Sequence, residues 1–158
     1  MTAGRVSAIG LLALSVALVG CGPGGSTKAP KANQLPLLPG AKIVAQDTQC
    51  DKGADAFCAL QLVVVDTKFK SSEDFVNAEH DYIHSHGWDG VTADTGDERA
   101  AESPGHKLRA TYGTAIGDLQ GIELGWIHRS HTISKALSKT LFEHSAAMSV
   151  ELDRGSSN

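Results

Sequence analysis

Apolar and polar residues alternate in several short segments after residue 40, as they do in β-strands that are buried on one face. Residues 41–48 and 59–66 are rich in β-branched residues and flank a short polar stretch, so they predict a hairpin. The second of them is apolar on both faces toward its end, which predicts a central strand with both faces covered. Further strands are expected at residues 88–94, 107–113 and 147–153. The last of these alternates throughout, which predicts one buried and one solvated face.

A helical period replaces the alternation between residues 70 and 88. Ser71 or Ser72 is suited to cap the amino-terminal end, acidic residues fill the first turn, and Gly87 marks the stop. The expected buried face holds Phe75, Val76, Ala78, Tyr82 and Ile83. Glu79 projects toward the same side, and we expect it at the edge of that face.

Between the two predicted helices, residues 94–106 are charged, contain Gly and Pro, and predict an exposed loop. Further on, glycine recurs at every fourth position, at Gly113, Gly117, Gly121 and Gly125. This spacing occurs in helix-packing faces in membranes, but the charged residues within the segment do not suit a lipid environment. In a soluble helix, the four glycines would cost about 4 kcal/mol relative to alanine. We therefore expect strand, loop and strand over residues 113–127, with a helix as the alternative.

Residues 131–144 predict a second amphipathic helix, with Lys135 and Lys139 on its polar side. Two helices and about five strands favour an α+β fold, a two-layer sandwich in which an antiparallel or mixed sheet carries both helices on one face. A ferredoxin-like arrangement is one fold of this kind. We expect a single globular α+β domain over residues 41–154, followed by a tail at residues 155–158.

The first twenty residues form a different kind of segment. Arg5 precedes an uncharged apolar run at residues 6–19, which is the layout of a secretory signal peptide, here residues 1–20. About 14 apolar residues are fewer than the roughly 20 that span a membrane as a helix, so an uncleaved signal anchor is the weaker alternative. The run ends in Leu18-Val19-Gly20-Cys21, which resembles the lipobox of bacterial lipoprotein precursors.

The lipobox resemblance implies that Cys21 carries a diacylglyceryl group and becomes the first residue of the mature protein. Its acyl chains, palmitate among them, imply a membrane anchor, because two chains attach stably where one binds only reversibly. Residues 21–40 then comprise the lipidated cysteine and a linker rich in Gly and Pro. In its layout the chain also resembles small lipoproteins of high-GC Gram-positive bacteria. This resemblance implies a place on the extracytoplasmic face of the cell membrane but no activity.

The net charge bears on the kind of partner the protein binds, and the cysteine count bears on its disulfides. The formal net charge is −4 and no basic stripe offsets it, so we expect no nucleic-acid partner. With Cys21 assigned to lipid, Cys50 and Cys58 remain as an even pair in an exported chain, and we expect them to form a structural disulfide. A redox-active pair would be more closely spaced. A calcium loop over residues 51–55 is a weaker alternative because it lacks ligands.

Local motifs of hydrolases, metalloproteases and nucleotide-binding loops are absent from the sequence. The one candidate metal site is His80 and His84, four residues apart on the polar side of the first helix, a spacing at which two imidazoles reach one transition-metal ion. Asp81 lies beside them as an oxygen ligand, and surface histidines without metal are the alternative. We expect no cofactor other than a transition metal at this pair.

The anchor, the linker and the lack of catalytic motifs predict a non-catalytic binding or scaffolding module of the cell envelope, with an unknown envelope protein or ligand as its partner. A surface metal-binding protein that uses the helix histidines is one alternative. An envelope hydrolase whose active-site residues are dispersed along the chain is the other. The sequence identifies no ligand.

Overall fold

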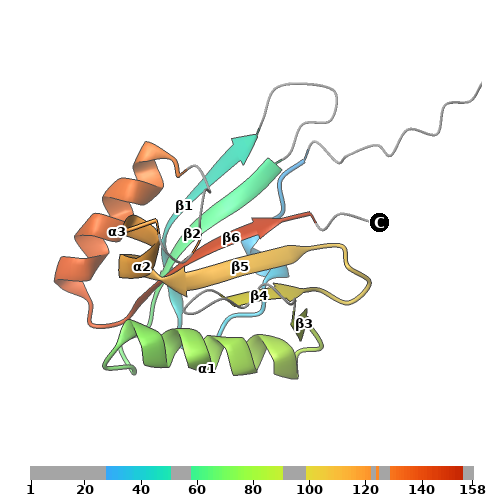
Figure 1. The fold of residues 1–158 in the computed structure, drawn as a ribbon, viewed down its shortest axis with the longest axis horizontal. Coiled ribbons are helices and arrows are strands. Elements are labelled where there is room, and N and C mark those ends of the chain that lie inside the picture. Colours follow the sequence, from blue (N-terminus) through green and yellow to red (C-terminus); the bar gives the residue numbers. More distant parts are fainter. Residues whose placement is uncertain (1–27, 51–57, 91–98, 122–123, 125–128, 155–158) are drawn as a thin grey trace, which may run out of the picture.

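The computed structural model describes residues 28–50, 58–90, 99–121, 124 and 129–154, which build one sheet with helices (Figure 1). The elements in chain order are η1 (Ala32–Gln34), β1 (Lys42–Cys50), β2 (Cys58–Val65), α1 (Ser72–Ser85), β3 (Asp89–Gly90), β4 (Arg99–Glu102), β5 (Arg109–Thr114), α2 (Ala115–Leu119), α3 (His131–Glu143) and β6 (Ala147–Asp153). The order in the sheet is β1-β2-β6-β5-β4-β3, and neighbouring strands are antiparallel. The predicted α+β class is thus confirmed, and of the antiparallel or mixed sheet that the sequence predicted, the structure has the antiparallel form.

The sheet has six strands in the described residues, where the sequence led us to expect about five. β4 is the strand that the sequence did not reveal, because it lies within the charged stretch that predicted a loop. It pairs with β5, and its two alanines, Ala100 and Ala101, are buried. Four residues are too few to show a clear alternation, so the pattern alone did not distinguish this strand from a loop.

The two longer helices cover opposite faces of the sheet (Figure 1). On one face, Leu62 and Val64 of β2 share a core cluster with Phe75 of α1. On the other face, Val63 of β2 shares a separate cluster with Ile133 of α3. Successive side chains of a strand point to opposite faces, so the two helices lie on different sides. The expectation that both helices share one face is therefore wrong, and the two-layer arrangement is not confirmed.

β6 is a central strand with both faces covered. It pairs with β2 on one side and β5 on the other. The sequence predicted that the face carrying Ser149 and Glu151 would be solvated, but both residues are buried, with exposed fractions of 3% and 8%. The reason is tertiary, because α2 and α3 pack over this polar face.

The glycine-rich segment 113–127 contains a short helix in place of the expected loop. Thr114, the last residue of β5, caps α2 by accepting a hydrogen bond from the Gly117 amide at 3.1 Å. Gly121, just beyond the helix, has a φ of +71°, a conformation that suits glycine at a helix end. Most of the expected second strand lies outside the described residues. The local cap thus outweighed the low helix propensity of glycine.

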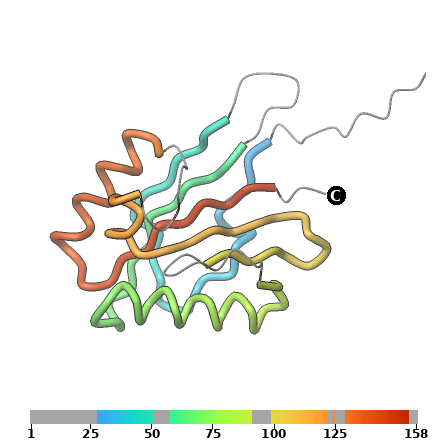
Figure 2. Tube along the Cα trace, in the orientation of Figure 1, coloured from blue at the N-terminus to red at the C-terminus, as the bar shows by residue number. Residues whose placement is uncertain are grey.

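Residues 28–41, most of which the sequence placed in the linker, lie against the domain (Figure 2). Leu35 has an exposed fraction of 5% and belongs to the core cluster beneath α1. The Arg154 Nε donates a hydrogen bond at 2.8 Å to the carbonyl of Lys28, which joins the start of this segment to the end of β6. Cys21 and the signal peptide lie outside the described residues. Within the described part of the chain, no helix is long and apolar enough to cross a membrane.

Helix α1 begins as the sequence predicted. Ser71 caps it and accepts a hydrogen bond from the Asp74 amide at 3.1 Å. Gly87, just past its end, has a φ of +78°. Glu79 departs from expectation, because it lies at the centre of the buried face with an exposed fraction of 0%.

The burial of Glu79 ties the amino-terminal segment to α1. The Leu38 amide donates a hydrogen bond to its Oε2 at 3.1 Å. Burial raises the pKa of Glu79 to about 7, with a contribution from the charge of Asp66, although the hydrogen bond from Leu38 acts in the opposite direction.

The predicted hairpin and its disulfide are both confirmed. β1 and β2 pair antiparallel, and a disulfide joins Cys50, the last residue of β1, to Cys58, the first residue of β2, with 4.1 Å between their Cα atoms. The residues that the calcium-loop alternative concerned lie outside the described part of the chain.

Candidate functional site

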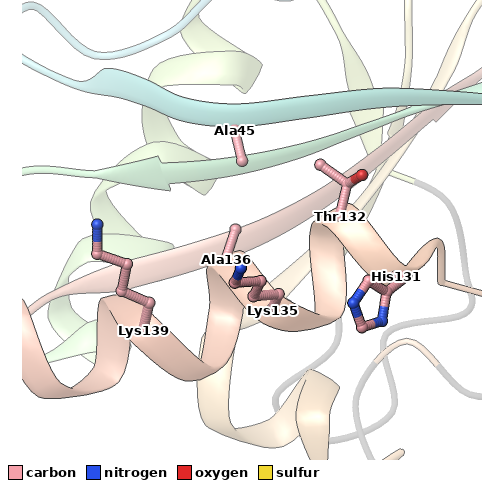
Figure 3. A pocket seen from close by; sticks show the side chains of 6 residues that line it. All are labelled: Ala45, His131, Thr132, Lys135, Ala136 and Lys139. Atoms are coloured by element: carbon pink, nitrogen blue, oxygen red, sulfur yellow. The ribbon is translucent and has the colours of Figure 1, made fainter.

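A shallow groove of about 430 Å³ lies between β1 and α3 (Figure 3). Its lining residues are Ala45 of β1 and His131, Thr132, Lys135, Ala136 and Lys139 of α3. Ala45 and Ala136 point toward each other across the groove, and Lys139 and Thr132 flank them (Figure 3). The two facing side chains are methyl groups, so the strand and the helix leave room between them.

Packing and capping place α3 beside β1. The helix buries Ile133 and Leu137 against the valines of β2, which leaves its polar side facing outward along the edge of the sheet. Ser130 caps the helix by accepting a hydrogen bond from the Ile133 amide at 3.2 Å. The polar side of this amphipathic helix was predicted from the sequence, but its position next to a strand edge was not.

A polar clamp fixes the beginning of α3 to the two neighbouring strands. We use this name for Asp47 of β1, Gln61 of β2 and Ser130. The Ser130 amide donates a hydrogen bond to Gln61 Oε1 at 3.2 Å, and its hydroxyl bonds the Asp47 carboxylate. The hydrogen bond from Ser130 is the main cause of a lowered pKa for Asp47, which keeps this carboxylate ionised.

β1 is the outermost strand of the sheet, and among the described residues no strand pairs with its outer edge. Residues 45–50 pair with β2 in unbroken register, whereas a bulge interrupts the pairing between Ile43 and Ala45. Ile43 and Val44, at this bulge, are exposed to 37% and 48%. The outer edge of β1 is not simply an open ladder, because the Thr48 amide donates a hydrogen bond to Asp47 Oδ1 at 2.8 Å.

Positive charge borders the groove although the whole chain is acidic. Lys135 and Lys139 are exposed and lie one helical turn apart on α3. Lys42 pairs with a residue whose side chain faces α3, so the register places it on the same face of the sheet. Lys139 also lies 3.7 Å from Glu143, but both side chains are more than half exposed and water screens the pair. Lys135 and Lys139 therefore give the groove positive charge on its α3 side, while the ionised Asp47 lies next to Thr132.

A second group of charged residues is buried on the same face of the sheet, nearer its centre. Asp118 of α2 pairs with Arg129, and Gln61 Nε2 donates to Glu151 Oε2 at 3.1 Å. Burial raises the pKa of Glu151, and burial together with the charge of Glu151 raises the pKa of Asp153 to about 6. We interpret this group as an internal network that holds α2 and α3 to the sheet. The alternating positions of Glu151 and Asp153 were visible in the sequence, but they predicted solvent exposure.

The structure brings together the two histidines that the sequence marked for a metal. The ring centroids of His80 and His84 are 4.3 Å apart, and the two rings meet edge to face. His80 Nδ1 forms a hydrogen bond with the hydroxyl of Tyr112, a fully buried residue of β5, at 2.9 Å. The pair therefore lies at the side of α1 that meets the sheet, half-buried, and not on its most exposed side. Among the described residues no group of three or more His, Cys, Asp or Glu side chains is placed to hold a metal ion.

No protein-family model, no curated protein and no solved structure matches this chain. The function must therefore be inferred from the chain's own residues and geometry.

Proposed function

We propose that this protein is an exported lipoprotein whose domain binds an envelope ligand in the groove between β1 and α3. A diacylglyceryl group on Cys21 anchors it to the extracytoplasmic face of the cell membrane. The domain acts by binding and not by catalysis. The observation that carries the proposal is a groove in which the edge strand β1 meets a helix face that carries two exposed lysines.

The anchor is supported by the lipobox at residues 18–21 and the apolar run before it. The disulfide between Cys50 and Cys58 agrees with export, because such bonds persist in oxidising compartments. Two acyl chains supply an attachment that is stable without a membrane-spanning helix.

The lining of the groove suits binding. Its six residues offer one hydroxyl, one imidazole, two ammonium groups and two methyl groups. Ammonium groups attract anionic ligands, and the methyl groups leave space for them. None of the six lining residues is a carboxylate, although Asp47 hydrogen-bonds Thr132, one of the six.

The anchor is tested by the intact mass of the protein from its native membrane fraction, beside a Cys21→Ala variant. We expect the wild type to lack residues 1–20 and to carry a diacylglyceryl increment, and the variant to leave the membrane fraction. A wild-type mass that retains residues 1–20 and shows no lipid would overturn the anchor.

The ligand site is tested by photo-crosslinking in living cells. A photoreactive phenylalanine replaces Thr132 in the groove or, as a matched control, Asp81 on the exposed side of α1. We expect a crosslinked product from position 132 and none from position 81. Equal products from both positions, or none from position 132, would contradict a ligand in this groove.

A second candidate function is capture of a transition metal by His80 and His84. The contact between their rings supports it, as does the hydrogen bond between His80 Nδ1 and the hydroxyl of Tyr112, which orients one imidazole in the way that outer partners orient metal ligands. Two imidazoles would hold such an ion together with water or with a further ligand.

A further inference from the structure

We infer that the domain lies against its membrane with the end of the sheet at which β6 ends, and that this end contacts the lipid headgroups. We call this surface the proximal end and define it by Lys28, Lys31, residues 103–108 and Arg154. The inference rests on the anchor in the proposed function. It goes beyond that anchor by assigning which side of the folded domain faces the bilayer.

The amino-terminal segment is bound to the domain from Lys28 onward. The Arg154 Nε donates a hydrogen bond at 2.8 Å to the carbonyl of Lys28, beside the end of β6. Further along, Leu35 is buried in the core cluster beneath α1. The Leu38 amide donates a hydrogen bond at 3.1 Å to Glu79 of that helix. These contacts hold the segment to β6, to the core and to α1, so it does not act as a free tether.

The chain that remains as a tether is therefore short. Only residues 22–27 separate the anchored Cys21 from Lys28. At about 3.3 Å per residue, the chain between these two residues spans about 23 Å when fully extended. For a flexible chain rich in glycine, the average separation is about 15 Å. Lys28 and the end of β6 beside it are thus held close to the bilayer.

Antiparallel pairing places the turn between β4 and β5 at the same end of the sheet. Asp153, the last residue of β6, pairs with Arg109, the first residue of β5. Arg109 also pairs with Glu102, the last residue of β4. Residues 103–108 therefore leave the sheet near the end of β6. Figure 2 shows this turn on the same side of the sheet as the start of the amino-terminal segment.

The exposed cations of the proximal end suit a layer of lipid headgroups. Lys28, Lys31 and Lys107 are exposed, and no ion pair joins their ammonium groups to another residue that the structure describes. Lysines near a bilayer surface are attracted by anionic headgroups. We therefore expect anionic lipid to strengthen the contact.

Acidic residues at the same end limit this preference. Glu102 and Asp153 flank Arg109 in the register, and its positive charge offsets part of theirs. Asp89 of β3 is exposed and pairs with Glu102. Residues 51–57, which join β1 to β2, contain one lysine and two aspartates. The proximal end is thus a mixed polar surface, so we expect it to rest on neutral headgroups and to prefer anionic ones modestly.

Large exposed apolar side chains lie away from the proximal end in the ranges that the structure describes. They belong to the start of β1, to α2, which follows the end of β5, and to the end of α3, just before β6 begins. These residues are Ile43, Val44, Ile116, Leu119 and Phe142. The contact at the proximal end is therefore made by polar groups at the level of the headgroups, without insertion into the hydrocarbon layer.

The test uses the mature lipoprotein in phosphatidylcholine vesicles that carry a nitroxide quencher on a small share of their headgroups. A fluorophore is attached to one introduced cysteine. The cysteine is either Pro104→Cys in the proximal turn or, as a matched control, Thr67→Cys in the exposed turn after β2 at the opposite end. We expect at least twofold stronger quenching at position 104. Equal quenching at the two positions, or stronger quenching at position 67, would overturn the inference.

The role of the lysines is tested by adding phosphatidylglycerol to the same vesicles. We expect the anionic lipid to increase the quenching at position 104. The combined substitutions Lys28→Glu, Lys31→Glu and Lys107→Glu should abolish this increase. The matched control changes three exposed lysines outside the proximal end, namely Lys70→Glu, Lys135→Glu and Lys139→Glu, and should keep it. An increase that survived in the first variant would overturn the contact between these lysines and the headgroups.

Flotation of the vesicles separates this inference from the proposed function. Protein that does not float with the vesicles removes the anchor, and the inference with it. Protein that floats but is quenched equally at both positions overturns the inference alone. The anchor and the groove of the proposed function would then remain.

Discussion

The hydroxyl of Ser130, which caps α3, donates a hydrogen bond to the carboxylate of Asp47 on β1. The contact joins the helix that forms one wall of the groove to the strand that forms the other. The same serine caps the helix through its side-chain oxygen and bonds β2 through its amide. One residue therefore sets both the start of α3 and its position beside the sheet edge.

Replacement of this cap is expected to affect both stability and the groove. Ser130→Ala should lower the free energy of unfolding by about 1 kcal/mol, the usual cost of losing a side-chain cap. It should also reduce the crosslinked product from position 132, because the clamp that positions α3 is lost. Urea unfolding and the yield of the crosslinked product measure the two effects.

The matched control for this variant is Ser71→Ala, which removes the corresponding cap of α1 on the opposite face of the sheet. We expect a similar loss of stability from it and no change in the crosslinked product from position 132. If both variants gave the same product as the wild type, the clamp would have no role in shaping the groove.

The buried carboxyl of Glu79 predicts a pH dependence of stability. Its pKa is about 7 in the folded protein and 4.5 in the unfolded chain. Between these two pH values the folded state therefore holds a proton that the unfolded state has released. The stabilisation that protonated Glu79 adds to the free energy of unfolding is complete below about pH 4.5. It is lost as the pH rises through 7. Relative to wild type, the Glu79→Gln variant should gain about 3 kcal/mol in free energy of unfolding between pH 4.5 and pH 8.

Urea unfolding at both pH values measures this difference. A Glu79→Gln variant whose stability followed the wild type at every pH would mean that Glu79 titrates normally in the fold.

The disulfide is expected to stabilise the edge hairpin. Cys50→Ser combined with Cys58→Ser removes a short closed loop, for which the chain-entropy model gives about 2.5 kcal/mol. Urea unfolding measures the loss, and a reductant should lower the wild type to the level of the variant while leaving the variant unchanged. Wild-type protein whose stability did not respond to the reductant would contradict a stabilising role.

The histidine pair predicts metal affinity that depends on both rings. Titration with Zn²⁺ should show a site that weakens at least tenfold when His80 and His84 are both changed to Ala. The double variant His86→Ala and His144→Ala changes two histidines outside the pair and should bind as the wild type does. Full affinity in the His80 and His84 variant would remove the metal function.

Local patterns in the sequence determined the hairpin, its disulfide, the two longer helices and a serine cap at residue 71 or 72. Each of these depends on residues close together in the chain, so alternation, helical period and capping preference were enough to predict them. The lysines of α3 were also placed correctly on the polar side of their helix.

The tertiary structure alone decided which face each helix covers and where the groove lies. The alternating pattern of β2 showed two buried faces, but it carried no information about which helix packs on which face. Ala45 and Ala136 are far apart in sequence, and only the packing of α3 beside β1 makes them face each other. Glu79 and Glu151 are buried for the same reason, because segments distant in the chain cover them. Whether a residue is buried depends on which other segments of the chain pack against it. The order of apolar and polar residues along the chain does not specify those contacts.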